Sequence, residues 1–516
     1  MTLPGGSGEP AAIEPVAQPA AEGVGATFGG SLASVAMRSL FWSLVQNWGG
    51  RMLNFLQFVL LAQLLSPREF GLAAAAAIIT LFITLVAEFG FGDAIIQRAD
   101  LKDRDVNLPF FFALGISVTL ALLAIAGADL FERWLKVEGL APVVRALSLI
   151  APITTVSQFQ EAVYKRHLAF KPLAVRVLVA NLVATFVSVP CAYLGFGVWS
   201  LVIQAYLVAI LGAAWIWYRP RWRPTRAIDL SSALGLGRFG VFVLAMRLLD
   251  FGATRLVEVL MIGRHGVRAY GFYTASGKLN QTLMDLLQSA LNDVSLSLLS
   301  KISQQRERLA SVYRLSIAIA GNVAPPVFVA IAALSPEVCG TLFNARWAGI
   351  ERIAALLFLL GAVQSLQFLS RPYLNARGRS EAVLVISILK FAIVIATLLV
   401  APSDSIYTLV LWYVLAQLAS APISFFVTSR ELGLPFWQVY VDLAPVALSC
   451  ALAFLAVGIA RQHVAALVAG PPVVNGIVLG VVFVAAYGVV IALTGRRQLG
   501  VVVDFARTRL RNRKHA

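Results

Sequence analysis

Apolar runs of helix length recur along the chain from about residue 38 to residue 495, separated by short polar connections. A run of about 20 apolar residues is long enough for an α-helix to cross the hydrocarbon core of a bilayer. The pattern therefore predicts about fourteen transmembrane helices. They are expected near residues 38–64, 70–96, 107–128, 141–162, 173–194, 197–218, 234–262, 269–299, 313–334, 349–374, 381–400, 405–428, 437–460 and 473–495.

A short internal repeat divides this series of helices. The segment SPREFGLAAAA (Ser66–Ala76) aligns with GVRAYGFYTAS (Gly266–Ser276), 200 positions further along the chain. The same offset places Phe70-Gly71-Leu72 over Tyr270-Gly271-Phe272 and Asp93 over Asp293. Because each repeat would hold an even number of spans, the two would have the same orientation in the membrane. The repeat predicts two related lobes of six helices each, followed by two additional helices.

The fold class that follows is an all-α polytopic membrane protein with two six-helix lobes around a central cleft and two C-terminal helices. We expect the lobes at residues 37–230 and 231–430, and the additional helices at 431–495. Residues 1–36 are rich in Gly, Ala, Pro and Glu and contain no Lys or Arg, which predicts a disordered cytoplasmic tail rather than a secretory signal. Residues 496–516 are expected to form a basic cytoplasmic tail.

Composition agrees with a membrane protein. Hydrophobic residues make up 59% of the chain and charged residues only 13%, where soluble domains carry about 25% charged residues. The mean hydropathy is +0.80. The three cysteines, Cys191, Cys339 and Cys450, are scattered without a metal-binding spacing, and there are four histidines. We therefore expect no metal site, no disulfide framework and no cofactor.

The positive charge follows the predicted topology. With the N-terminus inside, the inner connections hold about four times as many Lys and Arg residues as the outer ones, which places both termini in the cytoplasm. The inner set includes Lys165, Arg166, Lys171 and Arg176. The net charge of +16 is then a property of short loops beside membrane helices, so it does not indicate nucleic-acid binding. The basic C-terminal tail could also touch anionic membrane lipids.

One predicted span carries four ionisable residues. The stretch RLLDFGATRLVE contains Arg247, Asp250, Arg255 and Glu258. A charge at bilayer depth costs about 2.5–3.5 kcal/mol on insertion scales. At about 100° per residue the four side chains share an arc of about 140°, so one face can point into protein or water while the other stays apolar. Two interpretations remain: a functional site, or i,i+3 pairs that only hold the helices together.

Other predicted helices of both lobes share this polar character. The helix at 38–64 has a polar stripe that includes Arg51 and Asn54, and the helix at 269–299 has one that includes Lys278, Gln281 and Asp285. The helix at 70–96 ends with Glu88 and Asp93, and Lys390 lies within the span at 381–400. Basic residues in a cavity suit an anionic ligand, and nearby carboxylates could carry a coupling proton. The polar faces together predict a cleft between the two lobes.

The sequence also resembles a known family. The segment LAQLLSPREFGLAAAAAIITLFITLVAEFGFGDAIIQR (Leu61–Arg98) is similar to the signature of the first two helices in Wzx-type polysaccharide flippases and exporters, which belong to the multidrug/oligosaccharidyl-lipid/polysaccharide exporter superfamily. Its match to the family pattern P-x-E-[FY]-G begins at Pro67, and GFYTASGKLNQ (Gly271–Gln281) is similar to the family's second-lobe pattern. The resemblance extends to helix count and loop length over nearly the whole chain.

The resemblance implies a flippase for undecaprenyl-diphosphate-linked oligosaccharide repeat units in the bacterial cytoplasmic membrane, working by alternating access as an H⁺- or Na⁺-coupled antiporter. Its partners would be the lipid-linked substrate, the coupling ion, membrane lipids and a polysaccharide polymerase or co-polymerase complex. The candidate substrate-binding residues are Arg51, Asn54, Arg247, Arg255, Lys278, Gln281 and Lys390. The candidate ion-coupling residues are Glu88, Asp93, Asp250, Glu258, Asp285 and Asp293.

Three other functions compete with this hypothesis. A cation-coupled multidrug exporter or a lipid II flippase would share the fold, although a drug-binding cleft should be more acidic and more aromatic. A membrane polysaccharide polymerase or glycosyltransferase would need catalytic residues on an ordered outer loop, and the outer connections of about 5–14 residues are too short for such a site. We therefore expect no enzymatic activity. A purely structural membrane scaffold would leave the charged stripes unexplained.

Overall fold

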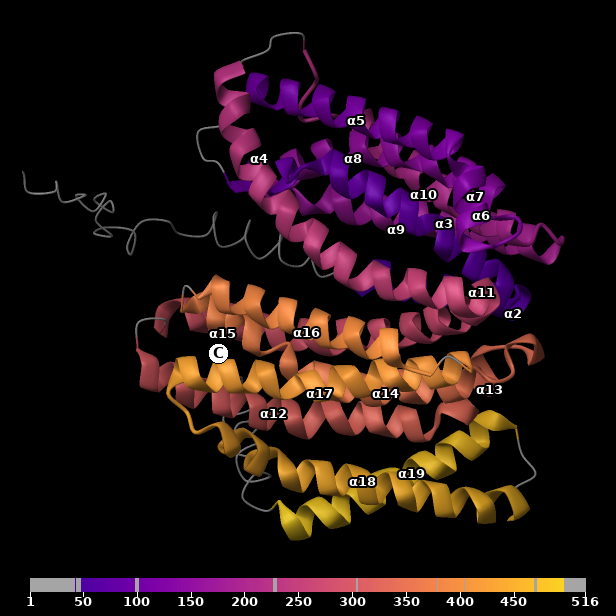
Figure 1. The fold of residues 1–516 in the computed structure, drawn as a ribbon, viewed down its shortest axis with the longest axis vertical. Coiled ribbons are helices and arrows are strands. Elements are labelled where there is room, and N and C mark those ends of the chain that lie inside the picture. Colours follow the sequence, from indigo (N-terminus) through magenta and orange to yellow (C-terminus); the bar gives the residue numbers. More distant parts are fainter. Residues whose placement is uncertain are drawn as a thin grey trace, which may run out of the picture.

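The computed structural model describes residues 42, 48–97, 102–225, 230–302, 305–377, 379–402, 404–467 and 471–495. Every regular element within these ranges is a helix (Figure 1). The predicted all-α class is therefore confirmed for this part of the chain. The two predicted tails, 1–36 and 496–516, lie outside the described residues.

The first half of the chain opens with a pair of helices whose junction is well defined. Ser66 is the N-cap of α3: the Ser66 amide donates to the Glu69 carboxylate at 2.6 Å, and the Glu69 amide donates to Ser66 Oγ at 3.5 Å. Pro67 occupies the first helical position, where its missing N–H costs nothing. The helices of this half are α2 (Gly50–Leu64), α3 (Pro67–Glu88), α4 (Phe91–Gln97), η2 (Asp103–Val106), α5 (Asn107–Ala126), α6 (Ala128–Leu135), α7 (Leu140–Ser148), α8 (Ile150–Arg166), α9 (Phe170–Tyr193) and α10 (Val198–Tyr218).

The second half begins with one long element. The predicted helices at 234–262 and 269–299 both lie within α11 (Leu230–Ile302), where Gly266 breaks the helical backbone with φ 77° and ψ 173°. Glycine adopts this conformation without the strain that a Cβ would introduce. The remaining helices are α12 (Arg306–Ala333), α13 (Ser335–Leu342), η3 (Ala345–Trp347), α14 (Ile350–Gln367), α15 (Ser370–Ala376), α16 (Ser380–Val400), α17 (Ile406–Leu432), α18 (Phe436–Leu467) and α19 (Pro472–Thr494).

Many of these helices can cross a membrane. In the described part of the chain, 11 helices are long and apolar enough to cross a membrane. Their most apolar windows have mean hydropathies of 1.5 to 2.8. The protein is therefore a multi-pass membrane protein. The number of fourteen spans stays a prediction, as do the domain boundaries.

The helices form two groups that lie one above the other in Figure 1, with α11 running between them. Helix α11 contributes to the cores of both groups. Ile262 and Tyr270 pack with residues of α3, α7 and α10 in the first group. Val257 and Met261 pack instead with residues of α14, α16 and α17 in the second group. Helix α11 is therefore packed into the hydrophobic cores of both halves.

The C-terminal end of α2 is capped by the other half of the chain. The Asn344 side chain donates to the carbonyl of Gln63 at 2.7 Å, and Arg346 donates to the carbonyl of Leu64 at 3.2 Å. The buried indole N–H of Trp347 lies 3.0 Å from the carbonyls of both Ala62 and Leu65. Helix ends leave carbonyls without intrahelical partners, and here the segment 344–347 supplies donors from the second half. This contact closes the end of the bundle that the predicted topology places outside.

Candidate functional site

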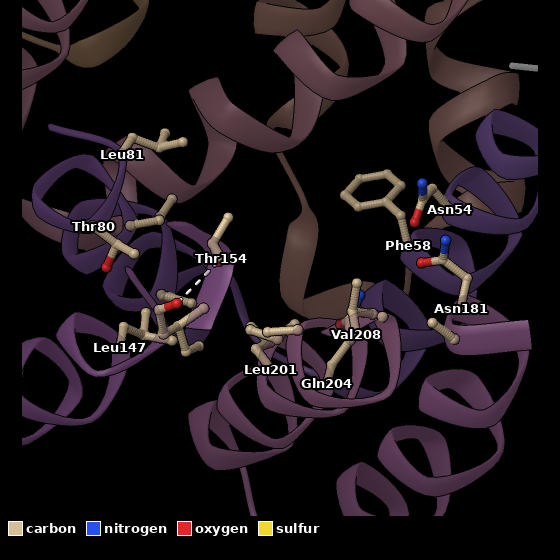
Figure 2. Close-up of a pocket in the computed structure, with 18 of the residues that line it drawn as sticks. Asn54, Phe58, Thr80, Leu81, Leu147, Thr154, Asn181, Leu201, Gln204 and Val208 are labelled. Carbon is tan, nitrogen blue, oxygen red and sulfur yellow. Dashed lines mark hydrogen bonds between the residues drawn. The ribbon is translucent and has the colours of Figure 1, made fainter. Parts of the chain in front are cut away.

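A cavity of about 780 Å³ lies within the first half of the chain and reaches α11. Its wall includes Asn54 and Phe58 of α2, Thr80 of α3, Asn181 of α9 and Gln204 of α10. Figure 2 shows Asn54, Phe58 and Asn181 on one side of this space, and Thr80 and Leu81 on the other. Most of the wall is apolar, and amide and hydroxyl groups are distributed over it. A small number of polar groups on an apolar wall is the usual composition of a ligand site.

Three charged side chains line the cavity: Glu161 of α8, Arg176 of α9 and Lys278 of α11. Arg176 Nη2 lies 2.6 Å from Glu161 Oε2, and the Arg176 side chain is only 13% exposed. The other carboxylate oxygen, Glu161 Oε1, lies 2.8 Å from Nζ of Lys165, one turn further along α8. Glu161 is thus placed between two cations, one on its own helix and one on the neighbouring helix.

Sequence reasoning missed the Glu161–Arg176 pair. Arg176 counts with the inner positive charges in the topology argument although it falls inside the predicted span at 173–194; in the structure it lies within α9 and faces the cavity. Glu161 falls inside the predicted span at 141–162 and was not selected. A systematic search for every charge inside a predicted span, rather than for several charges on one helix, would have found both residues.

Two of the predicted site residues line this cavity, namely Asn54 and Lys278. The other predicted residues that the structure describes belong to separate polar groups elsewhere. The side chains of Asp250 and Asp293 lie outside the described residues. Among the described residues, the predicted polar stripes therefore contribute to several separate polar groups.

Arg51 connects α2 to α11. Its Nη1 donates to the backbone carbonyl of Asp285 at 3.0 Å, and its Nε lies 3.7 Å from the carboxylate of Asp285. Gln281 donates to the other oxygen of the same carboxylate at 2.8 Å. Three predicted residues are thus brought together here, from segments more than 200 positions apart.

Arg247 connects α11 to the end of α3 and the start of α4. Its Nη1 lies 2.7 Å from Glu88 Oε2, and its Nη2 lies 2.7 Å from Asp93 Oδ2. The side chain holds one carboxylate with each arm of its guanidinium fork. Phe251, one turn further along α11, packs against Phe82 with 5.9 Å between ring centroids. The first part of α11 is therefore held by the first half of the chain.

Arg255 and Glu258 form the local pair that the i,i+3 interpretation predicts. Arg255 Nη1 donates to both oxygens of Glu258, at 2.6 and 2.7 Å. The buried hydroxyl of Tyr270 donates to Glu258 as well, at 2.7 Å. Lys390 donates to the side-chain carbonyl of Gln367 on α14, away from the cavity. These contacts stabilise the packing of α11 and α14 with their neighbouring helices.

The fold is similar to the folds of two membrane proteins of known structure. It is similar to the lipid II flippase MurJ in an inward closed conformation, with a TM-score of 0.68 and 10% identity over 89% of this chain and 100% of that chain. It is also similar to an inward-facing multidrug resistance MATE family transporter of the MOP superfamily, with a TM-score of 0.57 and 15% identity over 74% of this chain and 94% of that chain. At these identities the likeness concerns the fold alone.

Residues 60–352 match the family model described as polysaccharide biosynthesis protein, which is more than half of the chain, so the chain belongs to this family. Among curated proteins it is similar to the succinoglycan biosynthesis transport protein ExoT of Rhizobium meliloti (strain 1021), at 23% identity over 92% of this chain and 97% of the relative. It is also similar to the lipopolysaccharide biosynthesis protein WzxC of Escherichia coli (strain K12), at 20% identity over 79% of this chain and 85% of the relative. The family resemblance inferred from the Leu61–Arg98 signature is confirmed.

Proposed function

We propose that the protein flips undecaprenyl-diphosphate-linked oligosaccharide repeat units across the bacterial cytoplasmic membrane, for the biosynthesis of exopolysaccharide, capsule or O-antigen. The observation that carries this proposal is the cavity of about 780 Å³ within a polysaccharide-biosynthesis protein of transporter fold. The transport protein ExoT, similar over nearly the full length of both chains, supports the same function.

The chemistry of the wall suits a lipid-linked sugar. Asn54, Asn181 and Gln204 offer amide groups that both donate and accept hydrogen bonds, as sugar hydroxyls require. Arg176 and Lys278 outnumber the single carboxylate Glu161, so the lining side chains carry a net positive charge. A glycan bound to a diphosphate presents both features, neutral hydroxyls and an anion.

In this proposal the two halves move relative to each other and open the cavity alternately to the two sides of the membrane. The contacts of the segment 344–347 with the end of α2 close one side. We place both termini in the cytoplasm, and the coupling ion is a proton or a sodium ion. A polysaccharide polymerase or co-polymerase complex would receive the flipped unit outside.

The predicted site residues keep their proposed roles. Arg51, Arg247, Arg255 and Lys278 are candidates for contact with the diphosphate or with acidic sugars, each after release of its present partner where it has one. The carboxylates of Glu88, Asp93, Glu258 and Asp285 each lie beside an arginine. Such a carboxylate could exchange a proton when that arginine binds substrate instead.

The fold supports a second candidate, a lipid II flippase, because the likeness to MurJ covers the whole of that chain. Lipid II also joins a sugar to a polyprenyl diphosphate, so the two candidates share the anionic part of the substrate. The family match and the similarity to ExoT favour polysaccharide repeat units. A substrate competition assay with both lipid-linked sugars would separate them.

Leaflet-resolved translocation of a labelled polyprenyl-diphosphate oligosaccharide in liposomes tests the proposal. We expect wild type to translocate the probe and protein-free liposomes not to. Ala77→Phe would fill the cavity wall on α3 and abolish translocation. Val118→Phe adds the same ring on the exposed side of α5 and should leave the rate unchanged. Absence of translocation by wild type, or equal rates for the two variants, would contradict the proposal.

A further inference from the structure

We propose that Lys165, Glu161 and Arg176 form an exchange site for an anionic group of the transported ligand. The ligand's anion replaces Glu161 as the partner of Arg176, while Lys165 keeps Glu161 paired. This inference rests on the proposed function, because it assigns a part of the same cavity to one part of the lipid-linked substrate. We name the three residues the charge triad.

The geometry of the charge triad permits this exchange. The two oxygens of Glu161 are divided between the cations: Oε2 lies 2.6 Å from Arg176 Nη2, and Oε1 lies 2.8 Å from Lys165 Nζ. Loss of Arg176 to a ligand would therefore leave Glu161 with its partner on α8. The step avoids leaving a partly buried carboxylate unpaired, which is costly. Arginine offers five N–H donors in a planar fork, so Arg176 can bind phosphate or carboxylate oxygens with two parallel hydrogen bonds.

The charge balance favours an anion. Two cations and one carboxylate give the charge triad a net charge of about +1, on the assumption that all three are ionised. Arg176 is the more enclosed cation, with 13% of its side chain exposed against 40% for Lys165. Electrostatic attraction is stronger in a water-poor site, so the positive charge at Arg176 acts mainly on a ligand inside the cavity.

The position of the charge triad matches the shape of a lipid-linked sugar. Glu161 lies about one and a half turns, roughly 8 Å, before the end of α8 at Arg166. In the predicted topology this is the cytoplasmic end, so the site lies near the depth of lipid headgroups. Gln158 and Thr154 line the cavity one and two turns further from that end, on the same face of α8. An anion at Arg176 would leave these neutral polar groups for sugar rings.

Equilibrium binding to the purified full-length protein in nanodiscs tests the exchange. The anionic probes are farnesyl diphosphate, for the diphosphate, and digalacturonate, for an acidic sugar. Farnesol and cellobiose are their neutral counterparts. We expect wild type to bind at least one anionic probe better than its neutral counterpart. Arg176→Met should weaken that binding by about tenfold or more, and Arg176→Lys should restore part of it.

Lys165 gives the decisive comparison, because it does not line the cavity. Lys165→Met leaves Glu161 with Arg176 alone, so anion binding should weaken by about fivefold or more, while Glu161→Gln should strengthen it. The double variant Lys165→Met/Glu161→Gln restores the net charge of the wild type and should return affinity to within about twofold of it. Arg145→Met removes an exposed cation that pairs with Asp129 outside the cavity and should change nothing.

A pair that only holds α8 against α9 would give a different pattern. Unchanged anion binding in Lys165→Met, no recovery in the double variant, or no anionic probe bound by wild type would each overturn the inference. A response of farnesyl diphosphate or of digalacturonate supports it and identifies the anion. Where Arg176→Met does not fold, the Lys165 comparison decides. Translocation by wild type together with a failed charge pattern would reject the exchange site and leave the proposed function standing.

Discussion

Gly71 of α3 and Gly271 of α11 hold reciprocal positions where these two helices cross. A Cβ on Gly71 would lie 2.0 Å from the carbonyl oxygen of Val267, and a Cβ on Gly271 would lie 1.9 Å from the carbonyl oxygen of Pro67. Both the glycines and the carbonyls they face are 200 positions apart in sequence. The internal repeat thus meets itself in space, and small residues let the two backbones approach closely.

Alanine at either glycine should destabilise the protein, because no Cβ fits against a backbone carbonyl at these distances. We expect Gly71→Ala and Gly271→Ala each to cost about 1–3 kcal/mol, the range for overpacked sites. Thermal unfolding in detergent measures the effect. Gly115→Ala in α5 and Gly263→Ala in α11 are matched controls, since a Cβ there would meet nothing within 4 Å. Equal melting temperatures for all four variants would show that the crossing adapts.

Arg247 should be needed for stability as the partner of two carboxylates. Arg247→Met leaves Glu88 and Asp93 without their arginine partner. Because all three side chains are partly exposed, we expect the free energy of unfolding to fall by about 1–3 kcal/mol, between the values for surface and buried ion pairs. Adding Glu88→Gln and Asp93→Asn should recover most of the loss. The exposed pair of Arg145 and Asp129 is the control, with an expected loss of under about 1 kcal/mol. Lack of recovery in the triple variant would mean that Arg247 acts through packing.

Trp347 should hold the C-terminal end of α2 against the segment 344–347. Trp347→Phe keeps an aromatic ring against Phe343 and Phe70 but removes the N–H that reaches the carbonyls of Ala62 and Leu65. Buried carbonyls that lose their donor cost about 1–3 kcal/mol. Hydrogen exchange should become faster at residues 62–66 and 344–348 and stay unchanged in α8. Trp199→Phe at an exposed ring of α10 is the control, and equal exchange in both variants would speak against a closing role.

Cys339 should resist thiol reagents in the folded protein. It lies in α13, outside the predicted spans, and burial, with a smaller effect from Glu351, raises the pKa of its thiol to about 12. The thiol therefore stays neutral at pH 9, and maleimide should label it only after unfolding. Because the unfolded thiol ionises at lower pH than the folded one, this group should reduce stability as pH rises above about 9. Rapid labelling of Cys339 itself in the native protein at pH 8 would contradict its burial.

The helices and their order follow from local patterns, and so the sequence predicts them well. Ser66, Pro67 and Glu69 specify the start of α3 by capping alone. The break between the two helices of α11 falls at Gly266, within the segment 263–268 expected to connect them. The partners of Arg247 could not be predicted in this way. Its nearest carboxylate in sequence is Asp250, but the structure pairs it with Glu88 and Asp93, because the crossing of α3 and α11 brings those residues within reach.

The sequence by itself determined that this is an all-α multi-pass membrane protein of the polysaccharide biosynthesis family, because hydropathy, helix caps and short motifs act over neighbouring residues. It also determined that Gly71 and Gly271 correspond. Only the tertiary structure decided that these glycines touch, that Arg176 and Glu161 face a cavity, and that Arg255 is held by Glu258 and Tyr270. The physical reason is that a charge in a membrane must find a partner, and the packing of helices distant in sequence determines which partner it finds.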